Sequence, residues 1–373
     1  MTELREKENK IKYLYKLCPV RHIMLLVGAL ITCLYFLLRS NHGLMSAVSH
    51  GFVQPYHRLM SLVCSVFPFS VAELIYALAV IFALWYLSAF IVRMIKGQRR
   101  GAAVYKLLIT IITSLVCFYG GFCLLWGVYY HSFDFAAESG IESRNIRVEE
   151  LHTVTEYFAE KCNEYSLEVP RENKLYVADP KEIVRRSGDL YTAVELEHSF
   201  LEGRELSPKP MIFSEFMSWI NFTGFFFPFT GEANLNIYEP ICLLPSTCAH
   251  EIAHQRGVAA ENEANFTAVL ACMSSDDAEF KYSGALLAYI NLGNALYGVS
   301  PDTYYAVAGT LNEYVRADLA ANSAYWDQYE TKAAEVSETV YTGFLQSHGQ
   351  TLGMKSYGAC VDLLVVYYLE EAC

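Results

Sequence analysis

Long apolar runs alternate with short polar segments in the first third of the chain. Three such runs cover residues 23–38, 71–92 and 107–130. The first lies between Arg21 and Arg39, whose long side chains reach the lipid surface, and the second contains a single acid, Glu73. Because a helix needs about 20 apolar residues to cross a bilayer, we predict three transmembrane helices that form a membrane anchor over residues 1–130. A cleaved signal peptide fits less well, since two further runs follow the first.

Lysine and arginine are distributed unevenly around the three runs. The segment before the first run contains six of them and the segment between the second and third contains five, whereas the segment between the first and second contains two. Basic residues next to transmembrane helices remain in the cytoplasm. We therefore predict a multi-pass protein of the cell membrane with a cytoplasmic N-terminus, in which all residues after 130 lie outside the cytoplasm.

The segment at residues 40–68, between the first and second runs, is too short and too apolar for a domain. Within it, residues 50–63 predict a helix that lies in the membrane interface. The segment also contains His42, His50 and His57. We interpret them as scattered surface histidines rather than as metal ligands.

Charged residues return after residue 130, and we predict a globular domain over residues 131–373. Apolar spacing predicts helices at residues 147–165, 189–202, 282–297, 303–329 and 356–369, and short strands at 174–178 and 235–238. The helix at 282–297 is apolar enough to form part of the core, and Arg316 and Asp318 are interpreted as surface charges. The aromatic stretch at residues 225–229 fits either contact with the lipid surface or packing in the core.

The composition narrows the possible partners. With 40 acidic and 28 basic residues the chain has a formal net charge of -12, and no basic stripe occurs in its second half, which argues against a nucleic-acid partner. The chain contains 11 cysteines but no CxxC pair, so we expect buried free thiols rather than a zinc knuckle or a redox motif.

The candidate chemistry lies in the sequence STCAHEIAHQ at residues 246–255. On a helix, His250 and His254 project from the same face one turn apart, where both imidazoles reach a single Zn²⁺. Glu251 lies beside them and reaches a water molecule at the metal without binding the metal itself. This arrangement is typical of metal-assisted hydrolysis, with the carboxylate as the general base.

The third metal ligand follows a turn. Gly257 can adopt the left-handed conformation that ends a helix, and a second helix begins near Ala260. The metzincin pattern HExxHxxGxxH fails at Ala260, which cannot bind metal, so the ligand comes from elsewhere. We favour Glu261, because Asn265 lies one turn later and can support either the carboxylate or a ligating histidine. Glu263 is the alternative.

Two resemblances bear on these residues. The ExxAN sequence that starts at Glu261 is similar to the third-ligand motif of gluzincins, with asparagine in place of aspartate. The three N-terminal spans are followed by the segments FPFTGEANLN, LPSTCAHEIAHQRG, ENEANF and GMKSYGACVDLL. Together, the spans and these segments resemble a bacterial family of membrane proteins of unknown function that is treated as predicted zinc metallopeptidases. The resemblance implies that His250, His254 and Glu261 bind Zn²⁺ and that Glu251 is catalytic.

Gluzincins also use a strand before the zinc helix to pair with the extended substrate. The strand predicted at residues 235–238 is the candidate here, and an ordinary strand of a small sheet is an equal alternative. A donor for the transition-state oxyanion often comes from a C-terminal Tyr or His. His348 and Tyr357 are possible donors, and the sequence does not decide between them.

We therefore predict a membrane-anchored, mainly α protein, in which three N-terminal transmembrane helices precede a zincin-like α+β domain with a small sheet. The predicted function is zinc-dependent hydrolysis of peptide bonds outside the cytoplasm, with a peptide or protein substrate that is either soluble or membrane-associated. The alternative is a non-enzymatic membrane receptor or assembly factor with a structural zinc site. Such a site needs no general base and usually closes its fourth position with Cys or His.

Overall fold

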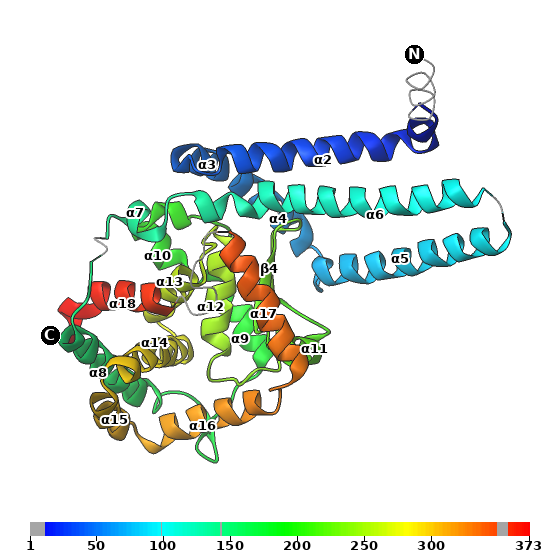
Figure 1. The fold of residues 1–373 in the computed structure, drawn as a ribbon. Coiled ribbons are helices and arrows are strands. Elements are labelled where there is room, and N and C mark those ends of the chain that lie inside the picture. Colours follow the sequence, from blue (N-terminus) through cyan, green and yellow to red (C-terminus); the bar gives the residue numbers. More distant parts are fainter. Residues whose placement is uncertain (1–11, 98, 142–143, 349–356) are drawn as a thin grey trace.

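The computed structural model describes residues 12–97, 99–141, 144–348 and 357–373 of the chain. Within them the protein is mainly helical, with two small sheets. Figure 1 shows three long helices that project together from a globular part built of shorter helices. The prediction of a mainly helical chain with a small sheet content is confirmed.

The three long helices correspond to the predicted spans. They are α2 (Pro19–Leu38), α5 (Val71–Ile95) and α6 (Arg100–Phe122), and each is long and apolar enough to cross a membrane. Helix α2 packs closely along α6, where a Cβ atom on Gly120 would lie 2.9 Å from the carbonyl oxygen of Gly28. Such small residues permit close helix contact in membranes. Most other side chains of these helices face outward, which suggests association with a membrane.

The segment between α2 and α5 folds onto the globular part. It forms α3 (His42–Val48), a π-helix (Ser49–Val53) and α4 (Gln54–Ser65). His42 and His50 are exposed, but the interpretation of His57 as a surface residue was wrong. Its ring is buried against Tyr129 and Phe226, and this burial lowers the pKa of His57 to about 3. The spacing of residues in the sequence does not indicate that His57 is buried, because both aromatic residues that pack on it come from distant segments.

The globular part is built around buried helices. Its helices are α7 (Phe135–Ser139), α8 (Val148–Tyr165), α9 (Pro180–Arg186), α10 (Thr192–Glu197), α11 (Ser214–Trp219), α12 (Leu244–Gln255), α13 (Glu261–Met273), α14 (Ala278–Val299), α15 (Pro301–Thr310), α16 (Glu313–Asp327), α17 (Lys332–Ser347) and α18 (Tyr357–Ala372). As predicted, α14 is a core helix, and it packs against α8, α12 and α13. The helix predicted at 189–202 is instead a short α10 between two 3-10 turns.

Two further predictions about side chains have opposite outcomes. All 11 cysteines are free and most are buried, as expected. Asp318, in contrast, is not a surface charge, although its neighbour Arg316 is exposed. The Asp318 carboxylate is buried and accepts hydrogen bonds from Arg171 Nη1 at 3.0 Å, Tyr176 N at 2.9 Å and Tyr282 Oη at 2.5 Å. These donors belong to other elements, so the spacing within α16 did not indicate them.

The strands form two separate sheets. Strands β1 (Arg171–Glu172) and β2 (Leu175–Tyr176) make an antiparallel pair, and β3 (Lys209–Pro210), β5 (Glu232–Leu235) and β4 (Gly224–Phe227) form a second sheet in the order β3-β5-β4. In that sheet Gly224 pairs with Leu235 and Phe227 with Glu232. The strand predicted at 235–238 was therefore placed too late, because β5 ends at Leu235. It is also the central strand, whereas β4, within the aromatic stretch, lies at the edge.

Candidate metal centre

Two helices joined by a tight turn bring the predicted ligands together. His250 and His254 lie one turn apart on α12, which ends before Gly257. Gly257 has a positive φ of 97°, and its amide donates to the carbonyl of His254 at 3.0 Å, a geometry that favours glycine at a helix end. The chain then reverses, so that Glu261, the first residue of α13, faces the two histidines.

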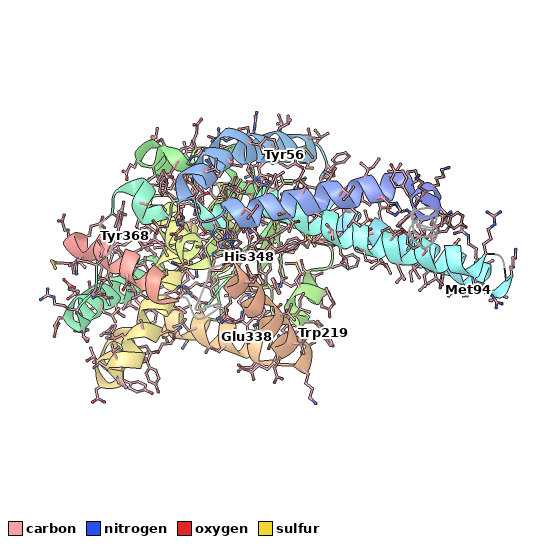
Figure 2. All side chains as sticks on the ribbon, turned by 45° about the horizontal axis from the view of Figure 1, so that its top comes forward. Tyr56, Met94, Trp219, Glu338, His348 and Tyr368 are labelled. Atoms are coloured by element: carbon pink, nitrogen blue, oxygen red, sulfur yellow. The ribbon has the colours of Figure 1, made fainter. Side chains whose placement is uncertain are left out.

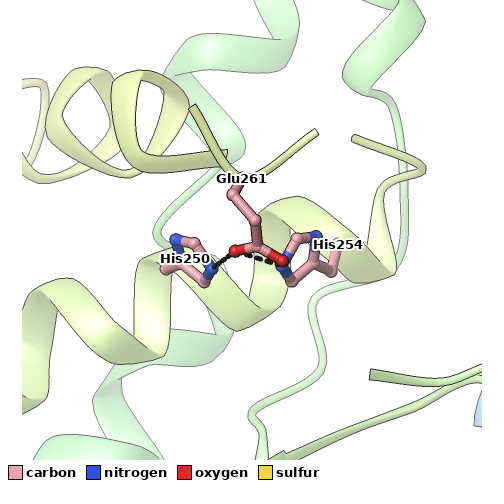
Figure 3. A group of neighbouring side chains, drawn as sticks. All are labelled: His250, His254 and Glu261. Carbon is pink, nitrogen blue, oxygen red and sulfur yellow. Dashed lines mark ion pairs between the residues drawn. The ribbon is translucent and has the colours of Figure 1, made fainter. Parts of the chain in front are cut away.

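The three side chains form a compact cluster (Figure 3). Glu261 Oε2 lies 3.2 Å from His250 Nε2 and 3.7 Å from His254 Nε2. One donor atom from each of the three residues lies within 4.8 Å of the other two. The imidazole rings are nearly perpendicular, at 88°, with their centroids 4.6 Å apart. The structure therefore brings together the three residues that were predicted as metal ligands.

Hydrogen bonds to the far side of each ring fix its orientation. His250 Nδ1 donates to Asn265 Oδ1 at 2.9 Å, and His254 Nδ1 donates to the carbonyl oxygen of Val258 at 2.6 Å. A carbonyl oxygen can only accept, so the Nδ1 atom of His254 carries a proton and Nε2 faces the cluster. Asn265 supports a histidine ring from behind, which is one of the two roles predicted for it.

The charges in the cluster favour a cation. Burial alone would raise the pKa of the Glu261 carboxyl, but the two imidazoles lower it well below its ordinary value. Burial alone would likewise lower the pKa of His254, but the Glu261 carboxylate raises it to about 9. The surroundings of these two residues therefore favour a positive charge between them. A divalent cation bound there would displace the proton.

The candidate base lies beside the cluster in a buried position. Glu251 is 2% exposed, and among the described residues its Oε2 atom has no hydrogen-bond partner. Burial raises the pKa of the Glu251 carboxyl to about 7, with His254 and His250 opposing this rise. The edge strand β4 leaves room for it at Gly224, where any Cβ atom would overlap the Glu251 carboxylate.

The alternative ligand points elsewhere. Glu263 Oε1 accepts a hydrogen bond from the backbone amide of Phe135 at 3.1 Å, and the side chain lines a different cavity. Burial raises the pKa of the Glu263 carboxyl to about 7. Glu261 and Glu263 are two residues apart on α13, so they project in different directions from the helix. The cluster includes only Glu261 of this pair.

A cleft of about 260 Å³ opens onto the cluster. Its walls come from the end of α6 and the segment after it, from the segment that includes β4, from α12 and the start of α13, and from α17, on which Figure 2 labels Glu338. The lining residues are Phe122, Trp126, Tyr130, Ile220, Asn221, Phe222, Thr223, Gly224, Phe225, Phe226, His250, Glu251, His254, Glu261, Ser337, Glu338, Tyr341 and Phe344. They include several aromatic rings, and the Trp126 ring lies 5.7 Å from that of His254.

Sequence reasoning missed one residue of the site. Tyr341 Oη donates to Glu261 Oε1 at 2.5 Å, across 80 residues of sequence. Burial and the nearby Glu261 carboxylate raise the pKa of the Tyr341 hydroxyl well above its ordinary value, so it remains a donor. Nothing local distinguishes it among 27 tyrosines. Of the donors considered from sequence, His348 is not part of the cleft lining, although its ring packs against the lining residue Phe122, and the Tyr357 side chain is outside the described residues.

The fold and the site define a mainly helical protein with three helices that can cross a membrane and a partly buried His-His-Glu cluster, which has a second acidic residue, Glu251, beside it. Residues 49–365 match a family described as a protein of unknown function, DUF3810, and the chain belongs to this family. The resemblance to a family of unknown function is thereby confirmed, whereas the likeness to gluzincins stays a prediction. Comparison with curated proteins and with solved structures gave no match.

Proposed function

We propose that this protein is a membrane-anchored zinc peptidase whose site lies on the outer face of the membrane. The observation that carries the proposal is the convergence of His250, His254 and Glu261 at the foot of a cleft, with Glu251 beside them. Two imidazoles and one carboxylate that leave a position open are the donor set of catalytic rather than structural zinc sites.

The donor set fits a divalent cation on physical grounds. Three carboxylates, those of Glu251, Glu261 and Glu338, line the cleft, and among the described residues of its lining there is no lysine or arginine to balance them. His250, His254 and Glu261 would hold the ion. Zinc bound there supplies Lewis acidity, which polarises a carbonyl group and makes water more acidic.

The chain's own residues account for the proton transfers. Glu251 is positioned to remove a proton from the attacking water and to deliver it to the leaving amine, while water oxygen bonds to the carbonyl carbon and the C–N bond breaks. The products are a carboxylate and an amine. Tyr341 holds Glu261 in place through its hydroxyl group. Among the described residues, β4 is an edge strand of its sheet, and it offers backbone groups with which an extended peptide can pair.

The experiment uses full-length protein purified in detergent without chelators. Zinc content is measured for the wild type, His254→Ala and Glu251→Gln, and each is tested against a peptide library. We expect bound zinc in the wild type and in Glu251→Gln, loss of zinc in His254→Ala, and cleavage only by the wild type. Glu251→Gln is the sharper variant, because it keeps the size of the side chain and all three candidate ligands.

Two other outcomes would change the conclusion. Zinc bound by a wild type that cleaves no peptide would favour the alternative of a receptor or assembly factor with a structural ion. A wild type without zinc, even after incubation with the metal, would remove the basis for both the peptidase and the structural zinc site.

A further inference from the structure

The cleft is built partly from the end of a candidate membrane span. Phe122 and Trp126 line it, and both belong to the candidate span Arg100–Gly127, in which a π-helix (Cys123–Gly127) continues α6 to a total of 28 residues. At about 1.5 Å per residue this helix is roughly 42 Å long, which exceeds the hydrocarbon core of about 30 Å and matches the bilayer with its headgroups. The last turns of the helix therefore stand at the level of the headgroups, where Trp and Tyr are enriched.

The sheet at the site is hydrogen-bonded to the first residues of a second candidate span, α5. The carboxylate of Glu232, on β5, accepts the backbone amides of Val71 at 3.2 Å and Ala72 at 3.0 Å. An acidic group is favourable at this positive end of α5. Ser70 Oγ also donates to Asn234 Oδ1, on the same strand, at 2.6 Å. Because β5 pairs with β4, these contacts hold the wall of the cleft close to the point where α5 begins.

An exposed apolar surface lies at the same level, and we call it the α11 patch. It consists of Ile212, Phe213, Phe216 and Trp219, which are 74%, 57%, 62% and 52% exposed. Glu73, in the first turn of α5, accepts the amides of Ile212 at 3.1 Å and Phe213 at 2.8 Å. In Figure 1, α11 lies on the side of the globular part toward which the long helices project, and Figure 2 labels Trp219 there. Large exposed apolar surfaces of this kind mark contact with lipid or protein.

We propose that the α11 patch rests on the outer lipid surface, and that the cleft takes polypeptides anchored in the same bilayer and cut within a few residues of it. This inference rests on the proposed peptidase function. Lipid is the occupant of the patch because the patch is hydrogen-bonded to the first turn of a span. The aromatic walls of the cleft suit apolar side chains of the substrate.

The first test compares one reporter segment, Gly-Phe-Leu-Ala-Gly, in three settings with zinc-loaded protein in phosphatidylcholine vesicles. The segment follows a transmembrane anchor directly, follows it after 30 Gly/Ser residues, or is free in solution. Such a spacer moves the segment roughly 30 Å away on average. We expect the directly anchored segment to be cut at least ten times faster than the spaced one at equal surface density.

The outcomes separate the two proposals. Equal rates for the direct and spaced segments would overturn the inference and leave the peptidase intact. If neither these segments nor a soluble peptide library is cut by zinc-loaded protein, the proposed function and the substrate class both fail. Phe216→Ser/Trp219→Ser is expected to slow the directly anchored substrate about tenfold and to leave cleavage of the free segment unchanged. The matched control is Tyr297→Ser/Tyr305→Ser, since these aromatic residues are 49% and 62% exposed on the distant α14 and α15.

A spectroscopic measurement tests the lipid contact without activity. The chain has four tryptophans, so variants that retain only Trp219 or only Trp85 report single positions, and Tyr305→Trp in a variant without the four native tryptophans reports the distant α15. Brominated phosphatidylcholine should quench Trp219, as it quenches Trp85 within α5, and should leave the tryptophan at position 305 unaffected. Quenching of Trp219 no stronger than that at position 305 would overturn the lipid contact.

Discussion

The sharpest prediction compares two glutamates on the same helix. Glu261→Gln removes the carboxylate that lies 3.2 Å and 3.7 Å from two histidine Nε2 atoms, whereas Glu263→Gln removes one that only caps the amide of Phe135. The substitution is identical and the positions are two residues apart. Glutamine at position 263 still accepts the Phe135 hydrogen bond through its amide oxygen, so zinc binding should not change there.

The size of the effect follows from the geometry. Loss of a group that only supports a ligand from behind lowers metal affinity about 10- to 100-fold. Asn265→Ala, which removes the partner of His250, should fall in this range. Loss of the Glu261 carboxylate itself should lower the zinc affinity by more than about 100-fold. At about 1.4 kcal/mol per tenfold change, this corresponds to more than about 2.8 kcal/mol of binding free energy.

The assay is competition for zinc against a fluorescent chelator, on full-length protein in detergent at neutral pH. Thermal unfolding of each metal-free variant serves as the folding control, because a misfolded protein would also lose zinc. A loss smaller than about 100-fold in Glu261→Gln, which is no more than the loss of a group that only supports a ligand, would refute its assignment as a ligand. An equal or larger loss in Glu263→Gln would refute the assignment as well.

Four further predictions test other parts of the structure. Gly224→Ala introduces a Cβ atom that overlaps the candidate base, so we expect kcat for peptide cleavage to fall about 100-fold with zinc retained; an unchanged kcat would contradict this packing. Asp318→Ala leaves buried donors without their acceptor and should destabilise the protein by about 3–5 kcal/mol in thermal unfolding, whereas Arg316→Ala should change stability by less than about 0.5 kcal/mol. The pKa of His57 is lowered to about 3, below an unfolded value of about 6.5, so the unfolded state binds more protons in this range. The contribution of His57 to the free energy of unfolding is therefore full above pH 6.5 and falls toward pH 3 by up to about 1.4 kcal/mol per pH unit. If the unfolding free energy of a His57→Gln variant has the same pH dependence as the wild type, this reasoning is refuted. Cys373 is exposed, so a membrane-impermeant maleimide should label it on intact cells if the globular part is outside, and a Cys373→Ser variant is the control; labelling only after lysis would place that part in the cytoplasm.

Local pattern was sufficient for the long elements and for the central motif. Apolar runs of the right length predicted α2, α5 and α6, because a membrane span has a simple composition requirement. The spacing of His250 and His254 placed both rings on one helix face, and Gly257 indicated the turn that returns the chain. Each of these inferences depends only on residues that are close to each other in the sequence.

Contacts between distant segments decided the rest. The partners that bury His57 and Asp318 come from other elements, so their own neighbours in sequence suggested exposed residues. Tyr341 reaches Glu261 across 80 residues, and no periodicity encodes that contact. The choice between Glu261 and Glu263 depended on the direction in which α13 leaves its turn, and the position of β4 at the sheet edge depended on strand pairing.

The sequence by itself therefore determined which chemical groups this protein has and which of them share a helix face. Tertiary structure alone decided which groups are removed from water, which carboxylate meets the two histidines, and that the cleft adjoins the end of a candidate membrane span. The physical reason is that helical periodicity acts over a few residues, whereas burial and electrostatic interaction depend on distance in space, whatever the separation in sequence.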